Sequence, residues 1–199
     1  MYRVIVADPP WSFEDKLEMN DVDRGAASQY DVMTVEEICR LPIQPLIADD
    51  AVLALWFVAA QPQAGLNVMA AWGFRQTQIW TWKKRTKTGK QAFGLGRLGR
   101  NSTEHLFVGV KGRIYKHLAS RSERTEFSAP ARAHSEKPEE LQDKLDRMFP
   151  RGHRLEMFAR RDRPDWDCVG LECPSTAGVD IRKWLCWKRT AIPRVDTRR

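Results

Sequence analysis

Short apolar runs of strand length alternate with segments of helical spacing along the chain. Thr34 and Glu37 form a capping box, which predicts a short helix that ends near Leu41. Residues 62–72 predict a second helix, which Gly73 stops. Strands are predicted where branched aliphatic and aromatic residues cluster, at residues 2–7, 52–59, 77–83, 105–110 and 154–159.

A third helix is expected from Pro138, which suits a first helical turn, to Phe149. Strands that alternate with helices indicate an α/β fold with a mainly parallel sheet and helices on both of its faces. Ligands bind such sheets beyond the carboxyl ends of the strands. Asp8 and Arg160 each follow a predicted strand, so we expect both at that edge.

Composition narrows the class of protein. Hydrophobic residues make up 42% and charged residues 30% of the 199 residues, as in ordinary globular proteins. No apolar run approaches the roughly 18 residues of a membrane-spanning helix, and the first residues do not resemble a signal peptide. The four cysteines show no metal-site spacing. We therefore expect reduced thiols, no metal, no membrane partner and a cytoplasmic location.

Positive charge is concentrated in two segments. Residues 83–100 carry seven lysines and arginines and no acid, and residues 182–199 carry seven bases and one acid. The whole chain has a net charge of +7, so the remainder is net acidic. Like-charge blocks often bind a polyanion, which favours a nucleic-acid partner. The alternative is a solvated loop and a solubilising tail.

The tetrapeptide Asp8-Pro9-Pro10-Trp11 follows the first predicted strand. Proline lacks an N–H and fixes φ, so this segment should be a stiff corner that offers a carboxylate and bare carbonyls. An acceptor-only corner suits an exocyclic base amine, with Asp8 and the Pro9 carbonyl accepting its hydrogens and Trp11 stacking on the ring. The alternative is a tight turn that closes the strand and buries Trp11 in the core.

Such a corner would address the weak nucleophilicity of a base amine, whose lone pair is delocalised into the ring. Two strong acceptors draw the nitrogen toward a pyramidal geometry. One well-placed group of this electrostatic kind contributes about 3–4 kcal/mol in other systems. The same reasoning admits adenine N6 and cytosine N4 as acceptors.

The tetrapeptide resembles the catalytic motif of S-adenosylmethionine-dependent amino-methyltransferases, and its form with tryptophan is similar to MT-A70-like adenine N6-methyltransferases of bacterial or phage DNA type. The similarity continues in the family's order through residues 29–34, 71–74, 100–112, 134–140, 154–160 and 166–172. The resemblance implies a Rossmann-like methyltransferase fold with permuted motif order, and S-adenosyl-L-methionine as cofactor.

The resemblance also implies roles for single residues. Asp8, Pro9, Pro10 and Trp11 would be catalytic, and Asp8, Lys137, Arg160 and Glu172 would bind the cofactor. Trp11, Asn101, His134 and Ser135 would face the substrate. Independently of the resemblance, charge and position predict that Lys83, Lys84, Arg85 and Lys87 contact the phosphates of the substrate. Leu171 stands where the family often has asparagine, which removes one hydrogen bond to the cofactor ribose.

These features predict methyl transfer to the N6 amino group of adenine in DNA by direct in-line displacement. Methylation of RNA is the main alternative. A non-catalytic nucleic-acid-binding subunit is disfavoured, because such relatives lose residues of the tetrapeptide that are intact here. Residues 1–172 are expected to form the catalytic domain and residues 173–199 a basic, partly docked tail. A homodimer is an open option.

Overall fold

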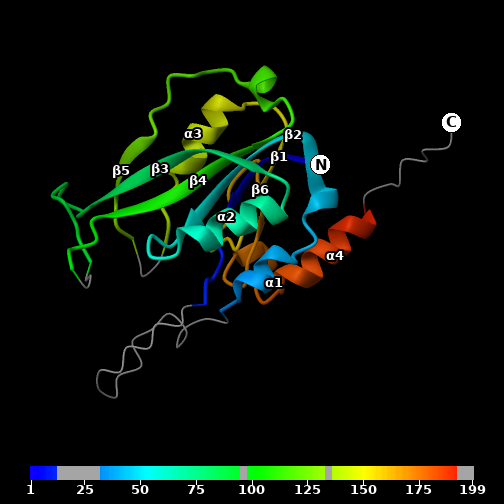
Figure 1. Ribbon diagram of the computed structural model, residues 1–199, viewed down its shortest axis with the longest axis horizontal. Helices are drawn as coiled ribbons and strands as arrows, with labels where there is room; N and C mark the ends of the chain where they lie inside the picture. Colours follow the sequence, from blue (N-terminus) through cyan, green and yellow to red (C-terminus); the bar gives the residue numbers. More distant parts are fainter. Residues whose placement is uncertain (13–31, 95–97, 133–135, 192–199) are drawn as a thin grey trace, which may run out of the picture.

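The computed structural model describes residues 1–12, 32–94, 98–132 and 136–191. Within them a seven-stranded sheet has the order β5-β3-β4-β2-β1-β6-β7 (Figure 1). The strands are β1 (Tyr2–Ala7), β2 (Ile47–Phe57), β3 (Arg75–Arg85), β4 (Thr103–Lys111), β5 (Glu126–Pro130), β6 (His153–Met157) and β7 (Asp167–Val169). The α-helices are α1 (Val35–Cys39), α2 (Pro62–Ala71), α3 (Glu140–Met148) and α4 (Ile181–Ala191).

The sheet is mainly parallel, as predicted. Strand β1 lies parallel between β2 and β6, with Ile5 opposite Leu53 on one side and Leu155 on the other. The pairs β6–β7 and β3–β5 are also parallel. Only β4 runs antiparallel to its neighbours β2 and β3 among the strands described. The amino end of β4 therefore lies at the same edge of the sheet as the carboxyl ends of β1, β2 and β6.

Helices cover both faces of the sheet, which confirms the predicted layers. Alternate residues of β1 point to opposite faces, so Ile5 joins one core cluster and Val4 joins the other, and both are fully buried. Helices α1, α2 and α4 pack on the Ile5 face, where Leu185 of α4 is fully buried. Helix α3 packs on the Val4 face through residues that include Leu141 (Figure 1).

Several predicted bounds agree with the structure. Strand β1 matches its prediction, and α2 ends one residue before the expected Trp72. The capping box is confirmed, because Thr34 Oγ1 accepts a hydrogen bond from the Glu37 N–H at 3.2 Å and Glu37 Oε2 accepts one from the Thr34 N–H at 2.8 Å. The start predicted for α3 was wrong. Its N-cap is Glu139, so Pro138 precedes the helix instead of opening it.

Three sheet features were not predicted. Strand β2 begins at Ile47, five residues early, because Ile47 already pairs with Tyr2 of β1 before the register shifts. Strands β5 and β7 are too short to give a sequence pattern of their own. Strands β3 and β4 follow one another without an intervening helix, so they pair antiparallel instead of as a βαβ unit. No helix in the described ranges is long and apolar enough to cross a membrane.

Candidate active site

A cavity of about 570 Å³ opens at the edge of the sheet where β1, β2 and β6 end and β4 begins. Parallel strands place their carboxyl ends together, and this edge is where α/β sheets bind ligands. The cavity is lined by nine of the residues singled out from the sequence, namely Asp8, Pro9, Pro10, Trp11, Lys84, Asn101, Lys137, Arg160 and Glu172. The fold therefore gathers residues that lie far apart along the chain.

The tetrapeptide after β1 forms a fixed corner. The Trp11 N–H donates to the Pro9 carbonyl at 2.9 Å, and the Met33 N–H donates to the Pro10 carbonyl at 2.8 Å. The sequence suggested bare carbonyls at this corner, but both carbonyls already accept a hydrogen bond. Each carbonyl oxygen has two lone pairs, so Pro9 keeps capacity for a second donor.

Trp11 anchors this corner to the core. Its ring is 7% exposed, and its indole N–H donates to the Trp56 carbonyl at 3.2 Å. The part of Trp11 that faces the cavity is small. The structure thus combines two readings of this residue that the sequence kept apart, burial in the core and a place in the cavity wall.

Four charged side chains form a chain along one wall of the cavity. The Lys137 ammonium donates to the Asp8 carboxylate at 2.9 Å and lies 3.3 Å from the Glu104 carboxylate. Glu104 also pairs with Lys84 at 2.6 Å. Lys137 Nζ lies 5.5 Å from the centre of the Trp56 ring, within cation–π range. The Asp8 carboxylate is thereby tied to Lys84 of the basic segment through Lys137 and Glu104.

The pKa shifts within this row of charged side chains follow from burial and from the number of charged partners. Burial raises the pKa of Asp8, and the attraction of Lys137 only partly offsets that rise. Burial alone would raise the pKa of Glu104, but Lys137 and Lys84 together hold it below its ordinary value. Burial alone would lower the pKa of Lys137, and the two carboxylates outweigh it and raise that pKa. Lys137 is therefore a stable cation, and the pKa values of the Asp8 and Glu104 carboxyls shift in opposite directions.

Arg160 and Glu172 form another part of the cavity wall, with 3.8 Å between Arg160 Nε and Glu172 Oε1. Close backbone contact brings them together, since a Cβ at Gly170 would overlap the carbonyl oxygen of Ala159. The Ala159 N–H donates to the Val169 carbonyl at 2.9 Å. Gly170 thus allows the loop after β6 and the loop after β7 to lie side by side.

The basic segment is divided by the fold. Lys83 pairs with Glu126 at 2.7 Å on the β5 side of β3, away from the cavity lining. Lys84 lies in the cavity wall, and Arg85 is half-buried at the end of β3. Lys87 is exposed beyond the strand. His134 and Ser135, the expected gate residues, lie outside the described residues.

Other cavity residues were missed in the sequence. Glu104 stood in the same noted motif as Asn101 but was given no role, and it lines the cavity from the start of β4. Trp56 and Phe57 sit within a continuous apolar run, which gives no sign that its last residues face a cavity. Phe57 stacks on Phe107 with ring centres 3.9 Å apart and closes that side. No group of three or more potential metal ligands occurs in the described part of the chain.

The chain is similar to several known proteins. Residues 2–172 match the family model MT-A70. The Type II methyltransferase M.MunI of Mycoplasma sp is 30% identical over 188 residues, covering 87% of this chain and 78% of that protein. The N(6)-adenosine-methyltransferase catalytic subunit METTL3 of Homo sapiens is 28% identical over 174 residues, covering 85% of this chain. The N(6)-adenine-specific methyltransferase METTL4 of Mus musculus is 28% identical over 183 residues, covering 86% of this chain.

The chain spans 28% of the length of METTL3 and 37% of METTL4, so it corresponds to a part of each of those larger proteins. The family match begins in β1 and ends at Glu172, and it contains every residue that lines the cavity. This chain belongs to the MT-A70 family.

Proposed function

We propose that this protein transfers a methyl group from S-adenosyl-L-methionine to the N6 amino group of adenine in DNA. One observation carries the proposal. The Asp8 carboxylate, held by Lys137 in a stiff corner, lines a cavity of about 570 Å³. Pockets for small molecules and cofactors have volumes of about 300–1,000 Å³, and a few convergent polar groups fix the ligand in them.

The charged groups of the cavity fit the cofactor. S-adenosyl-L-methionine offers an ammonium, a carboxylate and a ribose diol, and when bound it supplies an electrophilic methyl group on its sulfonium. Asp8 would accept from the ammonium and Lys137 would pair with the carboxylate. Glu172 would accept from the ribose hydroxyls beside Arg160. Leu171 is half exposed at this corner and offers no hydrogen bond there.

The same corner would activate the acceptor amine. Asp8 and the second lone pair of the Pro9 carbonyl would accept its two hydrogens and localise the nitrogen lone pair. After transfer the nitrogen is cationic and acidic, and a carboxylate oxygen of Asp8 can take up its proton. Its raised pKa makes Asp8 a better proton acceptor than an ordinary aspartate. This chemistry asks for no metal and no covalent nucleophile.

The β3–β4 connection, which carries the basic residues and Phe93, would hold the nucleic acid. The Ala92 N–H donates to the Lys84 carbonyl and the Gly94 N–H to the Asn101 carbonyl, at 3.0 and 2.8 Å. Both acceptors belong to cavity residues, so Phe93 stands beside the cavity wall with 67% of its surface exposed. A base taken out of a duplex would pass this ring, and aromatic side chains commonly stack on such bases.

DNA is favoured over RNA because the chain resembles short bacterial or phage enzymes. It covers 78% of the Type II methyltransferase M.MunI and only 28% of METTL3. We further propose that residues 1–172 form the catalytic unit. Helix α4 of the following segment packs on it through Trp184 and Leu185, and Lys188 pairs with Asp167 of β7 at 3.1 Å.

The test is the identity of the modified nucleoside. The protein is incubated with labelled S-adenosyl-L-methionine and with DNA and RNA oligonucleotides of matched sequence, and the nucleosides are separated after digestion. We expect N6-methyladenine from DNA. Label in RNA alone would show that RNA is the substrate. Label in N4-methylcytosine would show that cytosine is the acceptor. No label with any substrate would overturn the proposal.

A further inference from the structure

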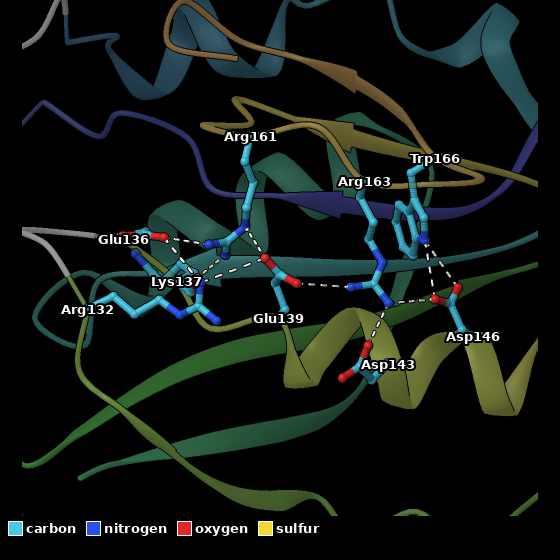
Figure 2. Close-up of polar contacts among 9 residues, drawn as sticks. All are labelled: Arg132, Glu136, Lys137, Glu139, Asp143, Asp146, Arg161, Arg163 and Trp166. Atoms are coloured by element: carbon cyan, nitrogen blue, oxygen red, sulfur yellow. Dashed lines mark hydrogen bonds and ion pairs between the residues drawn. The ribbon is translucent and has the colours of Figure 1, made fainter. Parts of the chain in front are cut away.

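Two consecutive arginines after β6 point to different surroundings. Arg160 lines the cavity, whereas Arg161 extends toward the segment that precedes α3. Figure 2 shows the Arg161 guanidinium among Glu136, Lys137 and Glu139. No family motif noted in the sequence assigned a role to Arg161.

The three donor groups of Arg161 reach three different residues around Lys137. Nη1 pairs with the Glu136 carboxylate, and Nε pairs with the Glu139 carboxylate at 2.8 Å. Nη2 donates to the Lys137 main-chain carbonyl at 2.5 Å. A planar guanidinium has a fixed fork of donors, so it sets the positions of all three acceptors relative to one another.

Lys137 belongs to neither a helix nor a strand. Lys137 lies outside α3, two residues before the N-cap Glu139, so its carbonyl cannot join the helical hydrogen bonds. Pro138 restricts the conformation of Lys137 but supplies no N–H. A lysine side chain has large rotational freedom, and its ammonium can bridge Asp8 and Glu104 only if its backbone is held in place.

We infer that Arg161 is a positioning residue for Lys137: it fixes the backbone of Lys137 so that the ammonium meets Asp8 in the catalytic corner. Arg161 also joins the loop that carries Arg160 to the segment that carries Lys137. One guanidinium thereby links the two segments that carry these cavity residues.

Arg163 supplies a matched control on the same loop. It pairs with Asp143 at 2.6 Å, Asp146 at 2.9 Å and Glu139 at 3.6 Å, so it also ties the loop to α3 (Figure 2). These partners lie within and just before α3, and none is Lys137. Replacing Arg163 therefore removes comparable ion pairs and the same charge but leaves the contact with the Lys137 carbonyl.

The first experiment uses the protein without ligand and does not depend on the proposed function. The pKa of Asp8 is measured by carbon-13 NMR in wild type, Arg161→Met, Arg161→Lys and Arg163→Met. Asp8 faces Lys137 from the segment before α3, Glu104 from β4, Arg160 from the loop after β6 and Glu156 from β6. We expect Arg161→Met to raise the pKa of Asp8 further, because the opposing ammonium is no longer held.

Arg163→Met should leave the pKa of Asp8 unchanged while lowering the melting temperature about as much as Arg161→Met. Arg161→Lys keeps the charge but not the fork, so it should show most of the rise. An unchanged pKa in Arg161→Met, or equal rises in Arg161→Met and Arg163→Met, would overturn the inference. A wild-type pKa in Arg161→Lys would show that charge alone matters and would also overturn it.

The second experiment rests on the proposed function and measures the affinity for S-adenosyl-L-methionine by calorimetry. Arg161→Met should weaken binding about tenfold, as expected when a charge-assisted contact is lost. The same change in a Lys137→Met background should have little further effect, because the group that Arg161 positions is gone. Fully additive losses would contradict the inference. Absence of binding by wild type would instead count against the proposed function, and the Asp8 titration would still decide the role of Arg161.

Discussion

The Lys137 ammonium meets the Asp8 carboxylate at 2.9 Å although 129 residues separate them in the sequence. The contact joins the end of β1 to the segment before α3, and both residues line the cavity. The role proposed for Asp8 depends on this contact, because a buried carboxylate without a cation would stay protonated.

Asp8→Asn should nearly abolish methyl transfer. The amide keeps the size of the side chain but loses the negative charge that polarises the amine, and kcat should fall by about 10²–10³. DNA affinity should change little. The measurement is single-turnover methylation, with the exposed Asp49 of β2 changed to asparagine as a control outside the cavity. Unchanged turnover in Asp8→Asn would remove the catalytic assignment.

As pH is lowered, the rate of methyl transfer should begin to fall at a higher pH than the ordinary pKa of an aspartate would give. Burial raises the pKa of Asp8 from 3.8, with Lys137 opposing, so the ionised form is lost at a higher pH than in a free aspartate. The active carboxylate is therefore present above this raised pKa and disappears as pH falls through it. The check is a pH profile of kcat at saturating substrates. An acidic decline of kcat centred at or below pH 3.8 in wild type would contradict the assignment of this decline to Asp8. The same decline in Asp8→Asn would contradict it too.

Exposed lysines beyond β3 should set the salt dependence of DNA binding. Changing Lys87 and Lys90 to glutamine should weaken binding to all sequences and reduce the slope of log affinity against log salt by about 0.9 per lost phosphate contact. Arg75 and Lys111, at the opposite end of the β3–β4 pair, supply the control double variant. Equal slopes in wild type and the Lys87/Lys90 variant would show that this connection does not contact phosphate.

Phe93→Ala should lower the affinity for DNA without changing its salt slope. Stacking of a base on an aromatic ring contributes about 1–3 kcal/mol and involves no counterion release. Ile79 of β3 is also exposed, at 51%, and Ile79→Ala is the matched control for loss of apolar surface. The assay is fluorescence anisotropy over a range of salt. Equal losses in the two variants would argue against stacking.

Gly170→Ala should disrupt the Arg160–Glu172 corner. The added Cβ would overlap the Ala159 carbonyl oxygen, so the two loops would have to separate. We expect a loss of stability of about 1–3 kcal/mol and weaker cofactor binding. Gly99→Ala meets no atom within 4 Å and is the control. Thermal unfolding and calorimetry measure the two effects, and wild-type values for both would refute the close-contact argument.

The sequence by itself determined the local elements and the chemical types of the site. The capping box of Thr34 and Glu37 predicted α1 because its hydrogen bonds join residues three positions apart. The run before Asp8 predicted β1 because strands buried on both faces need continuous apolar residues. Asp8 and Arg160 could be placed in advance because each follows a predicted strand, and Lys137 could be named because its motif resembles that of the family.

Only the tertiary structure decided which of those residues meet. The reversal of β4 brings Glu104 to the cavity, and nothing in the residues of β4 states its direction. Lys83 and Lys84 are adjacent and chemically equal, yet they point to opposite sides of β3, and only Lys84 faces the cavity. The physical reason is that burial, partner distance and strand direction are properties of packed neighbours, which may lie more than a hundred residues away along the chain.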